Sequence, residues 1–179
     1  MMVIFAIAMA LLAPGATALI AQAGEWLAMP MPEGFVTAHQ QTAQVGSIEE
    51  RIPQGETVEQ WTRMITLITL NTDSPPEAYA AEFDQRLQGG CPGARSAPHT
   101  VSRIGTRAAF DGQLDCPRNP ATGKPETLFY RVTSAGGRLH MVQVAFRSVP
   151  DAQGVAWARE RIGSAVLCTP RSTEPACKR

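Results

Sequence analysis

The sequence predicts an α+β fold: a mainly antiparallel sheet of about six strands with two helices packed on it, braced by two disulfides. Short runs that alternate in polarity and are separated by glycine and proline indicate the strands. Two stretches with apolar residues at helical spacing indicate the helices. An even number of cysteines, 4, supplies the braces.

The first residues have the layout of an export signal. An apolar run at residues 3–12 is followed by a Pro-Gly pair and then by Ala-Gln-Ala at residues 21–23, a site that signal peptidase would cut. A helix over that run rises only about 15 Å, half the hydrocarbon core of a membrane, about 30 Å. We therefore predict a signal peptide over residues 1–23, no stable membrane anchor after cleavage, and a single periplasmic or secreted domain over residues 24–179.

Cysteine usage agrees with export, because all four cysteines follow the predicted leader and an oxidising compartment would pair them. Among the three possible connectivities we favour Cys91–Cys116 and Cys168–Cys177, since each pair brackets one excursion of the chain. A zinc site is the alternative. The sequence has no C-x-x-C motif and its histidines are not at ligand spacing from any cysteine, so we expect no metal.

The first strands are expected as a hairpin of residues 35–41 and 44–52, whose second arm ends at a Pro-Gln-Gly turn. Residues 63–70 follow. They are rich in β-branched side chains and apolar on both faces, which is typical of a strand in the interior of a sheet.

The clearest helix start comes next, at Ser74. Serine is a favoured N-cap residue, the two prolines after it suit a first turn, and a glutamate follows where it would close a capping box. Tyr79, Phe83 and Leu87 form an apolar stripe, and a Gly-Gly pair would end it. We therefore predict a helix over residues 75–88.

The second half of the chain continues with strands and ends in a helix and a polar tail. The nine residues 117–125 hold three prolines and a glycine, which indicates a loop. Asp151 is a good N-cap for the last helix, whose apolar residues recur at helical spacing. The expected elements are strands over 100–104 and 107–116, the loop over 117–125, a hairpin of 126–133 and 138–147, and the helix after Asp151.

This order of elements is similar to that of the PsbP/Mog1-type sandwich. At the residue level, residues 55–66 (GETVEQWTRMIT) resemble a segment of small exported bacterial proteins of unknown function. Those proteins similarly carry a cysteine just after the first helix and another after the next strand, here Cys91 and Cys116. The resemblance brings no established activity with it, so it implies no catalytic residue.

Charge excludes some partners and leaves others open. The chain has 16 Lys+Arg against 16 Asp+Glu, which gives no reason to expect nucleic acid as a partner. Residues 24–90 hold ten acids and three bases, whereas residues 91–179 hold six acids and thirteen bases. If the two halves interleave in one sheet, their charges offset one another. If they segregate, the basic half presents a surface for an anionic ligand or an acidic protein.

The motifs of common enzymes are missing from the sequence: it has no nucleophile elbow, P-loop, dinucleotide-binding glycine motif or zincin motif. We therefore predict a binding or accessory module without catalysis and without a cofactor. The alternative is a small envelope hydrolase that uses His140 or His99 with Asp111 or Asp115. Against it, His140 alternates with apolar residues and is expected to be a satisfied core histidine, while His99 is expected to be exposed.

Long polar loops on rigid scaffolds are where recognition is usually found, so the loop over 117–125 is the main candidate site. Arg118, Asn119 and Lys124 would offer donors to an acidic group, and the expected partner is an unknown protein or a small anionic ligand. Trp61 lies among mixed charges and is a second candidate. The alternative is that its indole only covers one end of the sheet.

Overall fold

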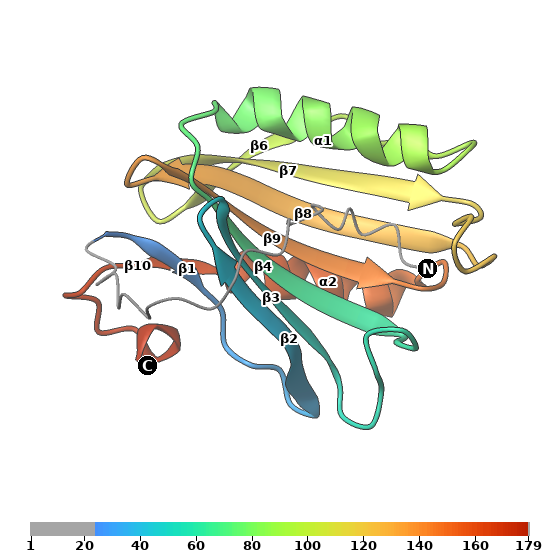
Figure 1. The fold of residues 1–179 in the computed structure, drawn as a ribbon, viewed down its shortest axis with the longest axis horizontal. Helices are drawn as coiled ribbons and strands as arrows, with labels where there is room; N and C mark the ends of the chain where they lie inside the picture. The colour runs from blue at the N-terminus through green and yellow to red at the C-terminus, as the bar shows by residue number, and fades with distance from the viewer. Residues whose placement is uncertain (1–23, 179) are drawn as a thin grey trace.

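The computed structural model describes residues 24–178 and has two sheets and two main helices (Figure 1). The predicted leader, residues 1–23, lies outside the described residues. The elements are β1 (Trp26–Ala28), β2 (Phe35–Ala43), β3 (Gly46–Pro53), β4 (Arg63–Leu70), α1 (Pro76–Gly90), β5 (Arg95–Ser96), β6 (Thr100–Ile104), β7 (Arg107–Cys116), β8 (Glu126–Ala135), β9 (Arg138–Phe146), α2 (Ala152–Gly163), β10 (Val166–Cys168) and a 3-10 turn, η1 (Pro175–Cys177).

The main sheet has eight strands in the order β2-β3-β4-β9-β8-β7-β5, with β6 also pairing with β7, and β1 pairs with β10 in a second, two-stranded sheet. Every pairing is antiparallel. The α+β prediction is confirmed, although the main sheet has eight strands where about six were expected. The sequence did not indicate β5 in the main sheet or β1 and β10 in the second sheet, which are two or three residues long, too short for a polarity alternation to show them.

The interior strand β4 lies between β3 and β9, as its two apolar faces predicted. Met64 faces the same side as α1 and packs in a core with Leu128 and Tyr130. Ile65 faces the other side and packs in a second core with α2. Figure 1 shows the two helices on opposite faces of the sheet, with α1 lying along β7 and β8. The fold is therefore held by two hydrophobic layers that share one sheet.

Helix α1 begins one residue later than predicted, and Ser74 is not its cap. The N-cap residue is Pro75, with ψ 133° and no capping bond from a side chain. Because a proline holds the residue before it away from helical backbone, Pro76 keeps Pro75 extended, and Ser74 falls one position too early. The cap of α2 is as predicted: the Asp151 side chain accepts the backbone N–H of Gly154 at 2.7 Å.

Both predicted disulfides are present. Cys91–Cys116 joins the end of α1 to the end of β7 with a Cα–Cα distance of 5.9 Å, and Cys168–Cys177 ties η1 to β10 at 5.5 Å. Two disulfides favour an oxidising, extracytoplasmic environment. Within residues 24–178, the helices are too short or too polar for a membrane crossing.

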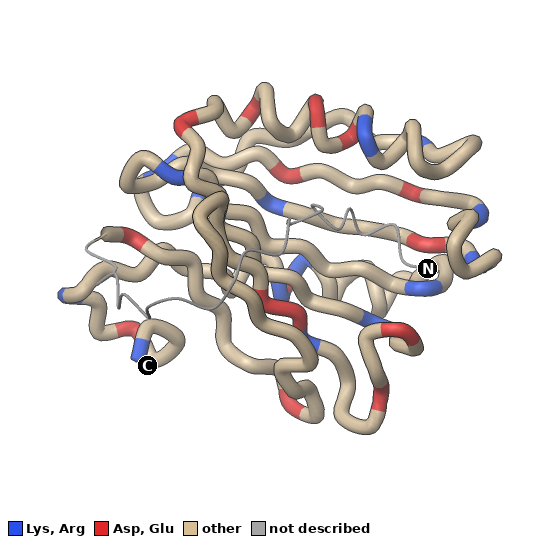
Figure 2. The backbone as a smooth tube through the Cα atoms, viewed as in Figure 1, with Lys and Arg blue, Asp and Glu red and all other residues tan. Residues whose placement is uncertain are grey.

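The two charge halves segregate in the sheet but not in the helical layer. Strands β2 to β4 come from the acidic half, and they meet the strands of the basic half where β4 pairs with β9. Helix α1 nevertheless carries acids of the first half over β7 and β8, so both signs occur along this face (Figure 2). Arg107 also pairs with Glu25 at 2.8 Å, which joins the two halves directly.

His140 lies on β9 in the core, as expected. Its ring nitrogens lie 3.0 Å from Thr69 Oγ1 and 3.3 Å from the carbonyl oxygen of Ala135, so a neutral ring that donates to Ala135 and accepts from Thr69 satisfies both. Burial lowers the pKa of His140, and the Ala135 hydrogen bond opposes this. The unfolded chain therefore binds this proton more readily than the folded protein does.

We expect His140 to make the protein sensitive to acid. Its contribution to the free energy of unfolding is fully present above the ordinary histidine pKa of about 6.5 and falls as the pH drops below that value. Urea unfolding between about pH 8 and pH 5.5 should show a shallower pH dependence in His140→Gln than in the native protein. His39→Gln, on the exposed strand β2, is the control. Equal pH slopes in the native protein and His140→Gln would contradict the prediction.

Candidate functional site

A pocket lies where the C-terminal end of α1, the end of β7 and the start of β8 meet. Its volume is about 50 Å³. Its walls are the aliphatic side chains of Leu87, Leu114 and Leu128 together with the Cys91–Cys116 disulfide. The pocket also opens on Gly90, Asn119 and Glu126. Apolar walls with a few polar groups at one end are typical of a binding site.

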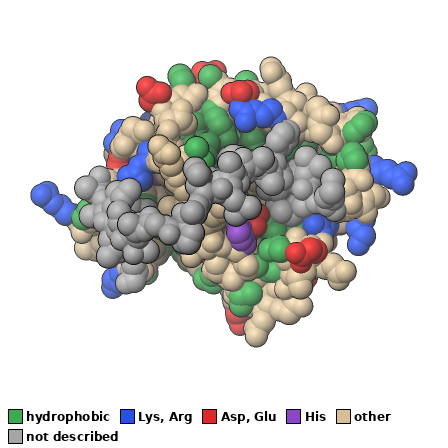
Figure 3. All heavy atoms as spheres, viewed as in Figure 1, with side chains coloured by type: hydrophobic (Ala, Val, Ile, Leu, Met, Phe, Trp, Pro, Cys, Tyr) green, Lys and Arg blue, Asp and Glu red, His purple; other side chains and the backbone are tan. Residues whose placement is uncertain are grey.

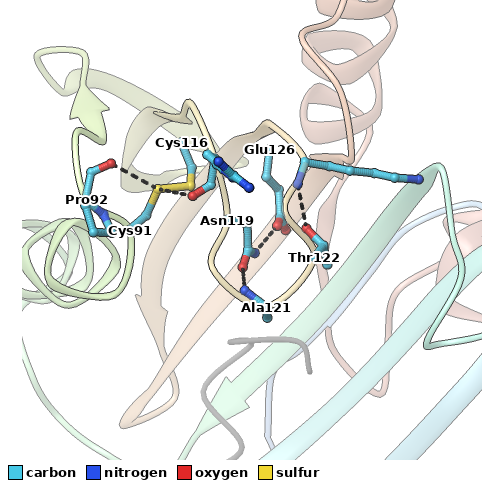
Figure 4. Close-up of a disulfide and its surroundings, with 9 residues drawn as sticks. Cys91, Pro92, Cys116, Asn119, Ala121, Thr122 and Glu126 are labelled. Carbon is cyan, nitrogen blue, oxygen red and sulfur yellow. Dashed lines mark hydrogen bonds between the residues drawn. A yellow bond between two sulfur atoms is a disulfide. The ribbon is translucent and has the colours of Figure 1, made fainter.

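Asn119 organises the loop that closes the polar end of this pocket (Figure 4). Its backbone N–H donates to the Lys124 carbonyl at 2.8 Å, and its carbonyl accepts from Gly123 at 2.7 Å. Its side-chain oxygen accepts the N–H of Ala121 at 2.9 Å, and its side-chain amide donates to Glu126. All its polar groups are therefore used inside the loop, and one of them fixes the Glu126 carboxyl.

Glu126 is the polar group that the sequence analysis missed. Burial raises the pKa of its carboxyl, and the Asn119 hydrogen bond and the charge of Arg147 oppose this. The signal was its position: Glu126, Leu128 and Tyr130 share one face of β8, so an acid stands in a row of core residues. A partly buried carboxyl at the end of an apolar pocket can accept a hydrogen bond or an ion pair from a ligand.

Trp61 lies next to this region without lining the pocket. Only 3% of its surface is exposed, and its indole packs in the α1-side core with Leu128. The guanidinium carbon of Arg147 lies 4.2 Å from the centroid of the indole, which is a cation–π contact. Arg147 also donates to the carbonyl of Glu59. The tryptophan thus covers one end of the sheet, and Arg147 separates it from solvent.

Of the loop residues proposed from the sequence, only Asn119 lines the pocket. The side chains of Arg118 and Lys124 are exposed. It is their backbone carbonyl oxygens that contact the rest of the structure. The carbonyl oxygen of Arg118 lies 3.7 Å from the Cys91 sulfur, and Lys124 accepts the Asn119 N–H. Anion binding by Arg118 and Lys124 stays a prediction.

The residues named for a hydrolase are engaged with other partners. His140 contacts Thr69 and Ala135, as described above. Asp111 receives two hydrogen bonds from Arg131, at 2.6 and 2.7 Å. Asp115 accepts from Thr127 at 2.9 Å. The structure therefore does not bring His140 together with either predicted aspartate.

His99 is not freely exposed, as the sequence had suggested, because it joins a buried network with Asp84 and Tyr130. Its Nε2 lies 2.9 Å from Asp84 Oδ2 and 2.8 Å from the Tyr130 hydroxyl, which donates to Asp84 Oδ1 at 2.7 Å. The loop before β6 folds His99 back onto α1. The spacing of polar and apolar residues in the sequence does not indicate this contact. The two donors satisfy a carboxylate on a residue that is only 6% exposed.

This network fastens α1 to the sheet. Asp84 comes from α1, Tyr130 from β8 and His99 from the segment before β6, so three elements meet at one carboxylate. Burial strongly raises the pKa of the Tyr130 hydroxyl, and Asp84 adds to this. The hydroxyl is therefore held as a hydrogen-bond donor. In the part of the chain that the structure describes, no three or more His, Cys, Asp or Glu side chains are placed to hold a metal ion.

Figure 3 shows the α1 face, where acidic and basic side chains stand among the hydrophobic ones along the helix. The pocket lies at the end of this helix, beside the disulfide.

Comparison with known proteins gives a likeness in shape only. No protein-family model matches the chain, and no curated protein matches its sequence. The Ran-binding protein Mog1p of Saccharomyces cerevisiae aligns with a TM-score of 0.52 at 12% identity, over 82% of this chain and 91% of Mog1p. A mutant of the protein Mog1 aligns with a TM-score of 0.54 at 11% identity, over 80% of this chain and 92% of that one.

A third protein of similar shape is the cyanobacterial PsbP (CyanoP) of Synechocystis sp. PCC 6803. It aligns with a TM-score of 0.52 at 9% identity, over 86% of this chain and 98% of CyanoP. The resemblance of residues 55–66 to small exported proteins stays a prediction. At such identities the likeness concerns the fold alone, and the predicted element order is confirmed: the chain has the fold of Mog1 and PsbP.

Proposed function

We propose that this protein is an exported, periplasmic or secreted binding module that acts as an accessory to a partner protein and performs no catalysis. The pocket at the end of α1 carries this proposal. Its volume of about 50 Å³ is far below the roughly 300–1,000 Å³ of sites that enclose a whole small molecule. It is the size for one anchoring group that projects from a larger partner.

Three observations support a binding role. The walls of the pocket are aliphatic and its polar end is a single carboxyl, which suits an anchor residue. The disulfide and the Asn119 loop hold those walls in place, so little ordering is needed when a partner binds. Mog1p, a Ran-binding protein, has the same fold, which supports protein binding as a use of this scaffold.

The test is to fill the pocket without changing its charge. Leu87→Phe should place a larger side chain in the cavity. Immobilised mature, oxidised protein would capture its partner from the exported fraction of the host, and Leu87→Phe should lower that capture about tenfold, equivalent to about 1.4 kcal/mol of binding free energy. Thermal unfolding would check that the variant is folded.

Val101→Phe is the control, since Val101 is 76% exposed on β6 and does not line the pocket. Capture should be unchanged in this variant. Equal capture by the native protein and a folded Leu87→Phe would show that the pocket is not the binding site, and would overturn the proposal.

A further inference from the structure

The carboxyl at the end of the pocket has no cation paired with it. Glu126 makes no ion pair with a described residue, and one of its oxygens, Oε2, is taken by the Asn119 amide. Its other oxygen, Oε1, has no hydrogen-bond donor among the described residues. Glu126 is half-buried beside apolar walls, so a charged donor that reached this free oxygen would be stabilised by the carboxylate.

Arg147 is the basic residue whose charge acts on Glu126, and its guanidinium has contacts with other groups. Arg147 stacks on Trp61 and donates to the carbonyl of Glu59. The charge of Glu126 acts on Arg147 more strongly than those of Glu56 and Glu59, so this cation is shared among three acids without forming an ion pair with Glu126. Arg118 and Lys124 are exposed, and water and salt screen their charges. The Glu126 carboxyl therefore has no ion-pair partner among the described residues, and a cation that entered the pocket could pair with it.

The walls set the shape of the group that can reach this carboxyl. Leu87, Leu114 and Leu128 offer only methyl and methylene surface, and the disulfide adds sulfur. A volume of about 50 Å³ holds a few heavy atoms in a row. A guanidinium is planar and carries five donors, whereas the pocket offers one free carboxylate oxygen. A primary ammonium on an unbranched alkyl chain is compact, so it fits both the small volume of the pocket and its single free carboxylate oxygen.

We propose that the pocket binds a primary ammonium at the end of an unbranched alkyl chain, the side chain of a lysine on the partner protein. This inference rests on the proposed function and adds the chemistry of the anchor. The methylene groups of the lysine pack against the three leucines, and its ammonium donates to Glu126 Oε1. The lysine then supplies the cation that Glu126 lacks in the free protein.

The experiment titrates the native, oxidised protein with four probes and follows binding by NMR. They are Nα-acetyl-lysine N-methylamide, its Nζ-acetylated form, the norleucine analogue and n-butylammonium. The lysine probe should bind about tenfold more tightly than the acetylated and norleucine probes, which keep the chain and lose the charge. n-Butylammonium should bind about as tightly as the lysine probe, because it carries the same chain and ammonium and the proposed contacts are all to these atoms.

Glu126→Gln tests the carboxyl itself, because glutamine keeps an oxygen for Asn119 and removes the charge. This variant should lose about tenfold in affinity for the lysine probe. Glu82→Gln is the matched control, because it makes the same chemical change at an exposed residue of α1 that pairs with Arg86 and does not line the pocket. It should bind the lysine probe as the native protein does.

The outcomes separate this inference from the proposed function. If norleucine binds as well as lysine, or Glu126→Gln binds unchanged, the lysine assignment is wrong. If the lysine probe binds and n-butylammonium does not, the contacts are made by the peptide backbone and the side-chain assignment is wrong. If no probe binds while Leu87→Phe still lowers partner capture about tenfold, the lysine assignment fails and the proposed function stands. If no probe binds and Leu87→Phe captures normally, both fail.

Discussion

Replacing Gly112 with alanine is expected to destabilise the protein by about 3–5 kcal/mol, because it combines overpacking of the core with loss of a buried hydrogen bond to a carboxylate. A Cβ added at Gly112 would lie 2.2 Å from Cζ of Tyr130 and 2.4 Å from its hydroxyl oxygen. Tyr130 is fully buried and its hydroxyl is bonded to Asp84, so the ring cannot give way without breaking that bond.

Urea denaturation followed by circular dichroism measures this loss. Gly89→Ala is the matched control, since a Cβ there meets nothing within 4 Å and alanine favours a helix. It should leave stability unchanged or raise it slightly. In a Tyr130→Leu background, which removes the atoms that the new Cβ would meet, Gly112→Ala should cost less than about 1 kcal/mol. An equal cost in both backgrounds would show that Tyr130 is not the obstacle.

Removing the Cys91–Cys116 disulfide by exchanging both cysteines for serine should lower the free energy of unfolding by about 3.5 kcal/mol. The estimate follows from the loop that the bond closes, whose ends are 25 residues apart. Because the same bond forms one wall of the pocket, the variant should also bind the lysine probe more weakly. Guanidinium denaturation and the NMR titration measure the two effects.

The second disulfide is the control for this result. Cys168 and Cys177 are 9 residues apart and line no part of the pocket. Exchanging both for serine should cost less, about 2.6 kcal/mol, and leave probe binding unchanged. If the two double variants lose equal stability and both bind the probe normally, neither the loop-length argument nor the structural role of Cys91–Cys116 at the pocket holds.

Most of the fold could be predicted because each long element carries its own local signal. The β-branched residues of β4 indicated an interior strand, and Asp151 marked the start of α2. The cysteine pairing followed from the order of the elements between the cysteines. These signals act over a few residues, so they do not depend on where distant segments come together. The N-cap of α1 was wrong for a local reason, the pair of prolines.

The candidate site could be predicted only in part, because it is made where separate segments meet. Asn119 was identified from its loop, but Glu126 was assigned simply as the first residue of a strand. Its significance depends on α1 and β7 closing around it. Asp84 was missed for the same reason: its partners are on β8 and in the loop before β6. Periodicity describes one element at a time and does not show such contacts.

The pairing of β4 with β9 has a consequence for how the chain reaches this fold. Leu70 pairs with Leu139 and Arg63 with Phe146, so one edge of an apolar interior strand has no partner until most of the chain has been synthesised. Contacts between such distant segments slow folding, and an unpaired apolar edge is prone to aggregate. A chain that crosses a membrane with its N-terminus first would expose that edge on arrival. If the chain is exported as proposed, its yield should therefore depend on holdase chaperones in the compartment that receives it.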